Sequence, residues 1–342
     1  MAYTDIDDPS AYFQTTLYTG NGGTLAVTNG GNSDLQPDWL WLKKRNASVN
    51  HFLFDSVRAV SKEINTNNTE AEASPSNYLA SFDSDGFSIG SDSDINGNND
   101  TLVAWQWKAG TAFSNDASST SVGSIDSVGS VNTDAGFSIV SFTGGGANAT
   151  IKHGLTSKPS MIIVKARGQA STWSVYHASL GATKFLRLND TNAVGTEAGW
   201  WNNTEPTASV FSIGTNHYAN TQIAYCFSEK QGYSKFGSYI GNGNADGTFV
   251  YLGFKPAWLL VKSTATNDWI LHDTKRSPHN VSNVTLFPNG SDADVTNTIY
   301  NQDILSNGFK ARTTHARLNG SGVSYIYMAF AEQPFVTSTG VP

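Results

Sequence analysis

Two acidic residues each stand three positions before an arginine, and the chain contains this spacing twice in similar surroundings. Asp55 precedes Arg58, and Asp273 precedes Arg276. A carboxylate can serve as a general acid or base, or as one of the two carboxylates of a glycosidase. A catalytic acid is not expected twice in one chain, and His177 takes the equivalent place in the middle of the sequence. We therefore expect two local ion pairs that close turns.

The serines and the single cysteine lack the patterns of nucleophilic enzymes. The segment 86–90 has the Gly-x-Ser-x-Gly spacing, but it is one of the Phe-centred strand segments and does not mark a nucleophile elbow after a strand. The segment 237–241 has a different spacing. Cys226 is the one cysteine, so it forms no intrachain disulfide, and no histidine is patterned with it. The acids are numerous, but no pair is singled out. The sequence predicts no enzyme, no cofactor and no catalytic residue.

The segment 92–97, Asp-Ser-Asp-Ile-Asn-Gly, resembles the start of a calcium-binding loop. Alternating oxygen ligands and a turn glycine are what such a loop needs, and Asp92, Asp94 and Asn96 would supply the oxygens. Val103 stands where the bidentate glutamate is expected. We therefore favour a polar hairpin with an Asn-Gly turn and no metal site, and keep calcium as a weak candidate.

Adjacent tryptophans occur in a polar stretch at residues 195–206. Trp200 and Trp201 are followed by Asn202 and Asn203. Flat aromatic faces beside amide groups are suited to sugar rings. The sequence thus predicts a glycan contact at these four residues, with coverage of a sheet edge by one tryptophan as the alternative.

These residues lie on a pattern that the chain repeats three times. A proline, a run of large apolar residues and a lysine six positions after the proline occur at 37–43, 159–165 and 256–262. The first two copies match without a gap over 37–67, and each copy then reaches a Phe-centred segment and an aromatic closing segment. Such extended similarity indicates internal repeats.

The segments of each copy are short, rich in Val, Ile, Thr and aromatic residues, and separated by Gly, Asn, Asp and Ser. This pattern is typical of antiparallel strands, and repeats of this size can bury a core of their own. We predict an all-β fold of three repeated antiparallel β-sandwich, jelly-roll-like modules with a short N-terminal arm. The expected division is an arm at 1–16, modules at 17–110, 135–232 and 233–336, and a Ser/Gly/Asp-rich linker at 111–134.

The arm is acidic and polar and precedes the repeated pattern. We expect it to anchor the chain in a larger assembly, and packing within the chain is the alternative. The residues expected to make the contact are Tyr3, Ile6, Asp7, Asp8, Pro9, Tyr12 and Phe13.

Composition excludes some partners. Only 14% of the residues are charged and the net charge is −7. Nucleic-acid binding is disfavoured, because it requires basic residues that release counterions from phosphates. No apolar run approaches the length of a membrane span, so we expect no membrane insertion.

The chain resembles a family of virion proteins of marine tailed phages, especially cyanophages. The match covers nearly the whole chain past the arm and contains no catalytic signature. The segments that carry it are 37–43, 54–58, 85–90, 103–110, 135–140, 235–239 and 329–332.

The resemblance implies a non-enzymatic virion structural protein at the particle surface, as a tail-fibre or capsid-appendage component. Its arm would bind other capsid or tail proteins, and its polar, aromatic surface would adhere to host-surface glycans. The alternative is a capsid decoration (cement) or tail scaffold protein without host binding, and a polysaccharide depolymerase ranks below both. The sequence leaves open whether the chain acts alone or as a homo-oligomer such as a trimer.

Overall fold

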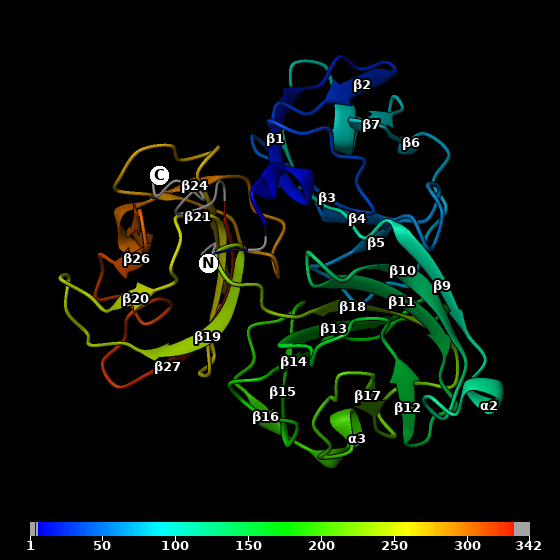
Figure 1. Ribbon diagram of the computed structural model, residues 1–342. Helices are drawn as coiled ribbons and strands as arrows, with labels where there is room; N and C mark the ends of the chain where they lie inside the picture. Colours follow the sequence, from blue (N-terminus) through cyan, green and yellow to red (C-terminus); the bar gives the residue numbers. More distant parts are fainter. Residues whose placement is uncertain (1–3, 5, 332–342) are drawn as a thin grey trace.

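The computed structural model describes residues 4 and 6–331, and most of the regular structure is β-strand. The strands form three groups, which we call unit 1 (13–107), unit 2 (111–227) and unit 3 (234–331). Each unit has one large sheet and a smaller one, and the three units form three lobes (Figure 1). The predicted all-β, antiparallel architecture is confirmed.

The large sheets differ in the number of strands. Unit 1 has the order β1 (Phe13–Thr19), β8 (Thr101–Trp107), β3 (Trp39–Lys44), β4 (His51–Asp55), β5 (Ile64–Asn65). Unit 2 has the order β16 (Gly195–Thr196), β15 (Lys184–Arg187), β14 (Ser174–His177), β13 (Met161–Ala166), β18 (Thr221–Phe227), β11 (Phe137–Thr143), β10 (Ser127–Asn132), β9 (Thr111–Asn115). Unit 3 has the order β19 (Ser234–Ile240), β27 (Ser324–Ala331), β21 (Pro256–Ser263), β22 (Trp269–Asp273).

The smaller sheets cover one face of each large sheet. They are β2 (Leu25–Thr28), β7 (Gly86–Ile89) and β6 (Leu79–Asp83) in unit 1; β12 (Ala149–Lys152) and β17 (Val210–Ile213) in unit 2; and β20 (Phe249–Tyr251), β26 (Gly308–Ala311) and β25 (Gln302–Leu305) in unit 3. Unit 3 also contains the short pair β23 (Val284–Thr285) and β24 (Val295–Thr296).

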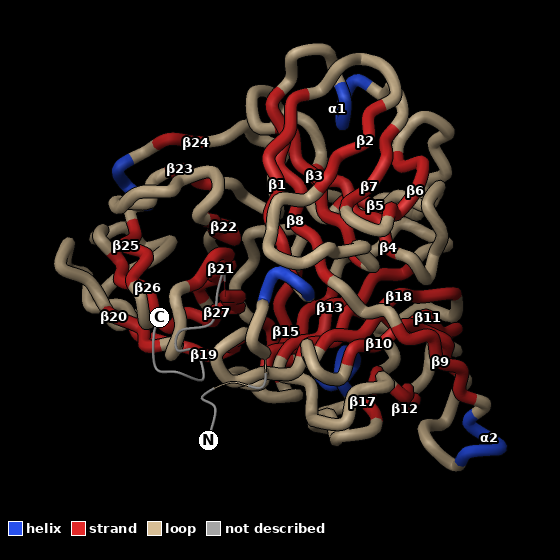
Figure 2. The backbone as a smooth tube through the Cα atoms, turned by 45° about the horizontal axis from the view of Figure 1, so that its top comes forward, coloured by secondary structure: helices blue, strands red, loops and turns tan. Residues whose placement is uncertain are grey.

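The helices of the described chain are single turns, and none is long and apolar enough to cross a membrane. They are seen as the blue segments of Figure 2. Their bounds are α1 (Ser93–Asn96), α2 (Ala117–Thr120), α3 (Ala198–Trp201), η1 (Pro9–Ala11) and η2 (Thr298–Tyr300).

The large sheets share a strand order. An opening strand pairs with the last strand of the unit, which pairs with the strand of the proline motif, followed by the next strand in sequence. A side-chain contact also recurs, since an asparagine Oδ1 accepts the backbone N–H of the first or preceding residue of β4, β14 or β22 at 2.8 Å. The pairs are Asn67 with His51, Asn189 with Trp173, and Asn289 with Trp269.

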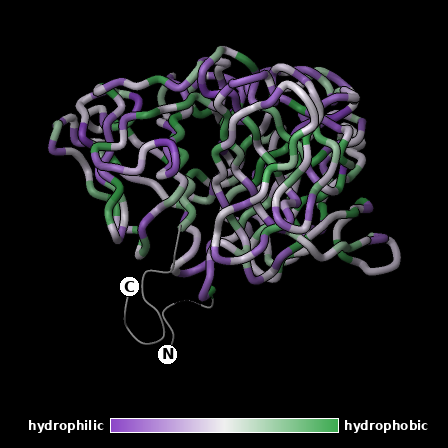
Figure 3. The backbone as a smooth tube through the Cα atoms, turned by 90° about the horizontal axis from the view of Figure 1, so that it is seen from above, coloured by the Kyte–Doolittle hydropathy of each residue, from purple (hydrophilic) through white to green (hydrophobic). Residues whose placement is uncertain are grey.

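The proline-motif strands are apolar throughout because both of their faces are buried. Alternate residues point to opposite faces of a strand. Trp39 and Trp41 enter a core that has residues from all three units, here called the shared core, whereas Leu40 and Leu42 face the smaller sheet of unit 1. Figure 3 shows how apolar and polar stretches alternate along the chain. The three lobes are therefore packed on one common centre.

Residues 111–134, expected to be a linker, instead form β9, α2 and β10. β10 pairs with β11 on one side and β9 on the other, which extends the sheet of unit 2. Few large apolar side chains are needed, because backbone hydrogen bonds supply the pairing. Gly129 has a further role, since a Cβ there would lie 2.1 Å from the carbonyl oxygen of Ile139. Unit 1 is thus not separated from unit 2.

The described part of the N-terminal arm folds onto its own chain. Ile6 and Phe13 belong to the shared core, and the ring of Tyr12 meets the ring of Tyr233, the residue just before unit 3, edge-on at 6.1 Å. The Asp8 carboxylate accepts hydrogen bonds from Ser10 and caps η1. The expected arm ends earlier than residue 16, because β1 begins at Phe13; Tyr3 lies outside the described residues.

Candidate functional site

The two predicted turn-closing ion pairs are confirmed, and both are fully buried. The Nε atom of Arg58 lies 2.5 Å from Oδ2 of Asp55, and Arg276 has the same contact with Asp273 at 2.5 Å. Each aspartate also accepts the backbone N–H of its arginine, at 2.9 Å and 2.8 Å respectively. Burial opposes the charge of Arg58, yet the neighbouring Asp55 carboxylate holds its pKa above the ordinary value.

Both aspartates also bind a side chain from another unit. Oδ2 of Asp55 accepts the hydroxyl hydrogen of Tyr225 in unit 2 at 2.7 Å. Oδ2 of Asp273 in unit 3 accepts the indole N–H of Trp105 in unit 1 at 3.1 Å. We call these contacts boundary 1–2 and boundary 3–1. Burial raises the pKa of Tyr225 well above its ordinary value, so this hydroxyl stays protonated and donates.

His177 makes the equivalent contact at boundary 2–3. Its Nε2 lies 3.1 Å from the carbonyl oxygen of Tyr327 in unit 3, and its Nδ1 lies 3.2 Å from the backbone N–H of Ser179. A carbonyl only accepts and an amide N–H only donates, so the ring is neutral with its proton on Nε2. Burial lowers its pKa to about 4, which favours this neutral form. The three contacts close a ring of three units.

A second set of backbone bonds follows the same ring. At boundary 1–2 the N–H of Glu72 donates to the carbonyl of Arg167, at 2.9 Å. At boundary 3–1 the N–H of Asp294 donates to the carbonyl of Arg45, at 2.7 Å, and at boundary 2–3 Val194 donates to Thr264, at 2.9 Å. Among the described residues, ion pairs reinforce the first two contacts, Arg167–Glu72 and Arg45–Asp294, each at 2.7 Å.

The lysine of each proline motif is buried with its ammonium among oxygen atoms. Lys165 Nζ donates to the carbonyls of Thr69 in unit 1 and Ser171, and Lys43 Nζ donates to Ser291 in unit 3. Burial lowers the pKa of Lys43, Lys165 and Lys262 to about 8 each. Lys262 Nζ donates to the carbonyls of Ser263 and Ala265 within unit 3. The repeated motif thus buries a weakly basic amine in each unit, where it binds main chain.

These buried groups hold the units together, so we assign them a role in stabilising the fold. The ionisable side chains at the boundaries are paired with each other or with carbonyls inside the protein. Among residues 4 and 6–331, no cluster of three His, Cys, Asp or Glu side chains could hold a metal ion. The thiol of Cys226 is buried, which raises its pKa.

The tryptophans predicted to contact glycans lie in the core of unit 2. Trp200 and Trp201 are in α3 and are 8% and 2% exposed. Trp201 packs against Tyr176, and both indoles contact the ring of His217. Neither ring has a free face for a sugar. The predicted glycan contact at the two tryptophans is therefore wrong. The short helix α3 turns both rings toward the core and leaves Asn202 and Asn203 exposed.

The calcium candidate is a helical turn. Asp92 caps α1 by accepting the N–H of Asp94 at 2.8 Å. Asn96 is buried, and its side chain binds the backbone of Asn21, Gly23 and Gly90. Its oxygen is therefore used within the protein, and the segment forms no loop around a cation. The expected Asn-Gly hairpin is also wrong here, since Asn96 ends α1 and β8 begins at Thr101.

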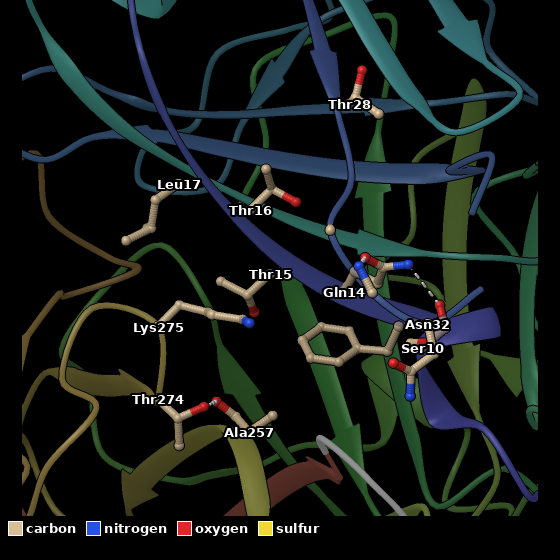
Figure 4. A pocket seen from close by; sticks show the side chains of 13 residues that line it. Ser10, Gln14, Thr15, Thr16, Leu17, Thr28, Asn32, Ala257, Thr274 and Lys275 are labelled. Carbon is tan, nitrogen blue, oxygen red and sulfur yellow. Dashed lines mark hydrogen bonds between the residues drawn. The ribbon is translucent and has the colours of Figure 1, made fainter. Parts of the chain in front are cut away.

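A hollow of about 440 Å³ lies between β1 and unit 3. Residues 13–17 of β1 form part of its lining. Ala257 and Thr274 lie across from Thr15 and Leu17 (Figure 4). Thr15 is only 8% exposed, and its hydroxyl has no hydrogen-bond partner within the described chain. We call this feature the β1 hollow.

An exposed aromatic pair, which sequence reasoning missed, lies on β20 of unit 3. Phe249 and Tyr251 are 44% and 54% exposed, and Val250 between them is buried. Phe249 pairs with Lys310 of β26, and Tyr251 pairs with Gly308. Residues 249–252 form a continuous apolar run, so the sequence contained no signal of this exposure.

The corresponding strands of the other units lack these rings. Val27 of β2 and Ile151 of β12 pair with phenylalanines as Val250 does. The neighbours that match Phe249 and Tyr251 are therefore Ala26 and Thr28 in unit 1, and Thr150 and Lys152 in unit 2.

Comparison with protein families matches residues 8–334 to a family described as a domain of unknown function, DUF7483. The chain belongs to this family. The DUF7483 match begins in the arm and ends beyond β27, so it includes all three units. No curated protein matches the chain.

Proposed function

We propose that the chain is a non-enzymatic structural protein exposed on a tailed-phage particle, and that unit 3 contacts host-surface glycans. We also infer that the units are three copies of one jelly-roll-like module. The common strand order and the recurring asparagine contacts support the repeat. The closed ring of boundary contacts supports a rigid block rather than modules on a flexible linker.

The exposed pair Phe249 and Tyr251 carries the binding proposal. Exposed aromatic faces beside charged donors and acceptors suit a sugar, which has both apolar C–H faces and hydroxyl groups. Lys310 pairs with Phe249, and its Nζ lies 2.6 Å from Oδ1 of Asp246. Nη1 of Arg312 lies 3.0 Å from the same oxygen. This position replaces the buried Trp200 and Trp201 as the glycan contact.

The phage setting rests on the sequence resemblance, and the arm has a smaller part in the proposal than the sequence suggested. The described arm residues pack on units 1 and 3, so they contribute to the fold of the chain. Attachment to the particle is therefore assigned to the surface of the units.

The test is binding of the full chain to purified host-surface polysaccharide. Replacement of Phe249 and Tyr251 by serine should abolish binding, whereas the matched changes Ala26→Ser and Thr28→Ser in unit 1 should preserve it. Equal binding by both double variants would reject the aromatic pair. Absence of any binding, together with peptides of this chain in purified particles, would favour the decoration or scaffold protein, and release of reducing sugar would favour the depolymerase.

A further inference from the structure

The strands β1, β11 and β19 occupy equivalent places in the three large sheets. The edge of each strand that faces away from the last strand of its unit has different neighbours in each unit. The N–H of Ser228 donates to the carbonyl of Gly136, and the N–H of Gly144 donates to the carbonyl of Asn220, so even-numbered residues of β11 face β18. The odd-numbered residues therefore turn their N–H and C=O groups to the other side, because these directions alternate in an antiparallel ladder. β10 occupies that side along the length of β11. Unit 2 thus fills the edge with a strand of its own.

Unit 3 binds several edge groups of β19 without adding a strand. The N–H of Ser234 donates to the carbonyl of Lys230 at 2.9 Å. The N–H of Phe236 donates to the Glu229 carboxylate at 3.3 Å. Farther along, the Thr248 hydroxyl donates to the carbonyl of Ile240 at 2.7 Å. These contacts protect the edge from another strand.

Within residues 4 and 6–331, unit 1 leaves the same edge open. Lys108 N–H donates to Tyr12, and Gly20 N–H donates to Asp100, so even-numbered residues of β1 face β8. Phe13, Thr15 and Leu17 therefore present their backbone groups outward, and β1 pairs with no strand other than β8 in the described chain. The same three residues line the β1 hollow. A row of backbone donors and acceptors thus faces an unfilled space.

We propose that the β1 edge binds an extended segment of a partner protein as an added antiparallel strand. Strand addition supplies affinity through main-chain bonds, and side-chain pockets supply selectivity. β10 indicates the chemistry of the segment, because it fills the equivalent edge with the sequence Ser-Val-Gly-Ser-Val-Asn. Small and hydroxyl-bearing side chains also suit the hollow, where Gly30 and Gly31 form part of the wall and the Thr15 hydroxyl has no hydrogen-bond partner among the described residues. This proposal does not depend on glycan binding or on the phage setting.

The test is amide hydrogen exchange of the full chain, measured by NMR, with a synthetic peptide of residues 126–134 at millimolar concentration. The amides of Thr15 and Leu17 should exchange at least about tenfold more slowly with the peptide, while those of β19 should be unchanged. The same peptide with proline in place of Ser130 should have no effect.

The decisive variant is Leu17→Pro, because it removes an outward N–H and leaves the bonds to β8 in place. It should abolish the protection, whereas the matched change Ser238→Pro in β19 should not. Absence of protection in the unaltered chain, or its persistence in Leu17→Pro, would overturn the proposal. A third outcome would also overturn the proposal. If the amides of Thr15 and Leu17 were protected without peptide, and truncation after Ala331 removed this protection, the added segment would belong to the chain itself. Leu17→Pro should bind polysaccharide normally, which separates this test from that of the proposed function.

Discussion

Boundaries 1–2 and 3–1 are built around buried ion pairs, whereas boundary 2–3 joins equivalent parts of the chain without one. Asp55 and Asp273 each bind an arginine and a side chain of the neighbouring unit. His177 reaches a backbone carbonyl as a neutral ring, and Leu180 stands where the arginine would be. The same position can therefore join two units with a compensated charge or with no charge.

The difference extends to the second contact of each boundary. Glu72 and Asp294 add ion pairs to their backbone bonds, but Val194 has an apolar side chain. A buried ion pair must recover the cost of removing two charges from water, whereas a neutral hydrogen bond has less to recover. The ring is therefore closed by common backbone geometry, while its electrostatics vary from boundary to boundary.

The largest effect is expected from breaking one ion pair. Asp55→Ala should lower the free energy of unfolding by about 3–5 kcal/mol, because it leaves the Arg58 guanidinium buried and without its main counter-charge. Denaturant unfolding measures the change. The double variant Asp55→Ala, Arg58→Met should recover much of the loss, and a loss below about 1 kcal/mol in the single variant would contradict the role assigned to the pair.

A smaller effect is expected at the neutral boundary. His177→Gln should cost about 1–2 kcal/mol at pH 7, through the lost hydrogen bond to Tyr327. The folded pKa of about 4 lies below the ordinary value of 6.5, so the unfolded chain takes up the proton first and stability falls as pH drops from 6.5 toward 4. The protonation of His177 therefore lowers the free energy of unfolding by about 3 kcal/mol at most.

Denaturant curves at pH 7 and pH 4.5 compare the two proteins. The variant should lose less stability on acidification than the unaltered chain, because its other buried histidines are unchanged. Identical losses would show that His177 is not held neutral.

The buried lysines of the proline motifs should change the free energy of unfolding at the alkaline end of the pH range. The folded pKa of Lys262 is about 8 and the ordinary value is 10.5, so between these values only the unfolded chain keeps the proton. Stability should therefore rise with pH, by about 2 kcal/mol per lysine between pH 8 and 9.5. Lys262→Met should remove its part of this rise in thermal or denaturant unfolding, and parallel curves would reject the assignment.

The smallest effect is expected away from the boundaries. Replacing Phe249 and Tyr251 by serine should change the free energy of unfolding by no more than about 0.5 kcal/mol per residue, because both rings are substantially exposed. Trp201→Ala, at a buried site, should cost about 3–5 kcal/mol. Similar losses at the two sites would mean that the exposed pair has a role in folding.

Local spacing made part of this arrangement predictable. An aspartate three residues before an arginine can close a turn by itself, so the pairs at Asp55 and Asp273 were predicted correctly. Alternation and β-branched content likewise predicted strands in each copy. The role of Lys165 was not predictable in this way, because one of its acceptors is the carbonyl of Thr69 in another unit.

Exposure was the property that sequence reasoning predicted least well. Trp200 and Trp201 were expected at the surface because their neighbours are polar, yet α3 turns them into the core. Phe249 and Tyr251 resemble core residues in sequence, yet their strand is at the edge of a sheet and turns both rings outward. The direction of a side chain depends on which sheet covers the strand.

The sequence by itself determined the positions rich in strand, the antiparallel all-β class and the local ion pairs, because these depend on residues close together along the chain. Only the tertiary structure decided that segment 111–134 adds strands to unit 2, that both faces of the proline-motif strands are buried, and that the units close a ring. Those outcomes depend on backbone pairing and on removal of side chains from water, and both require segments that lie far apart in the sequence to meet.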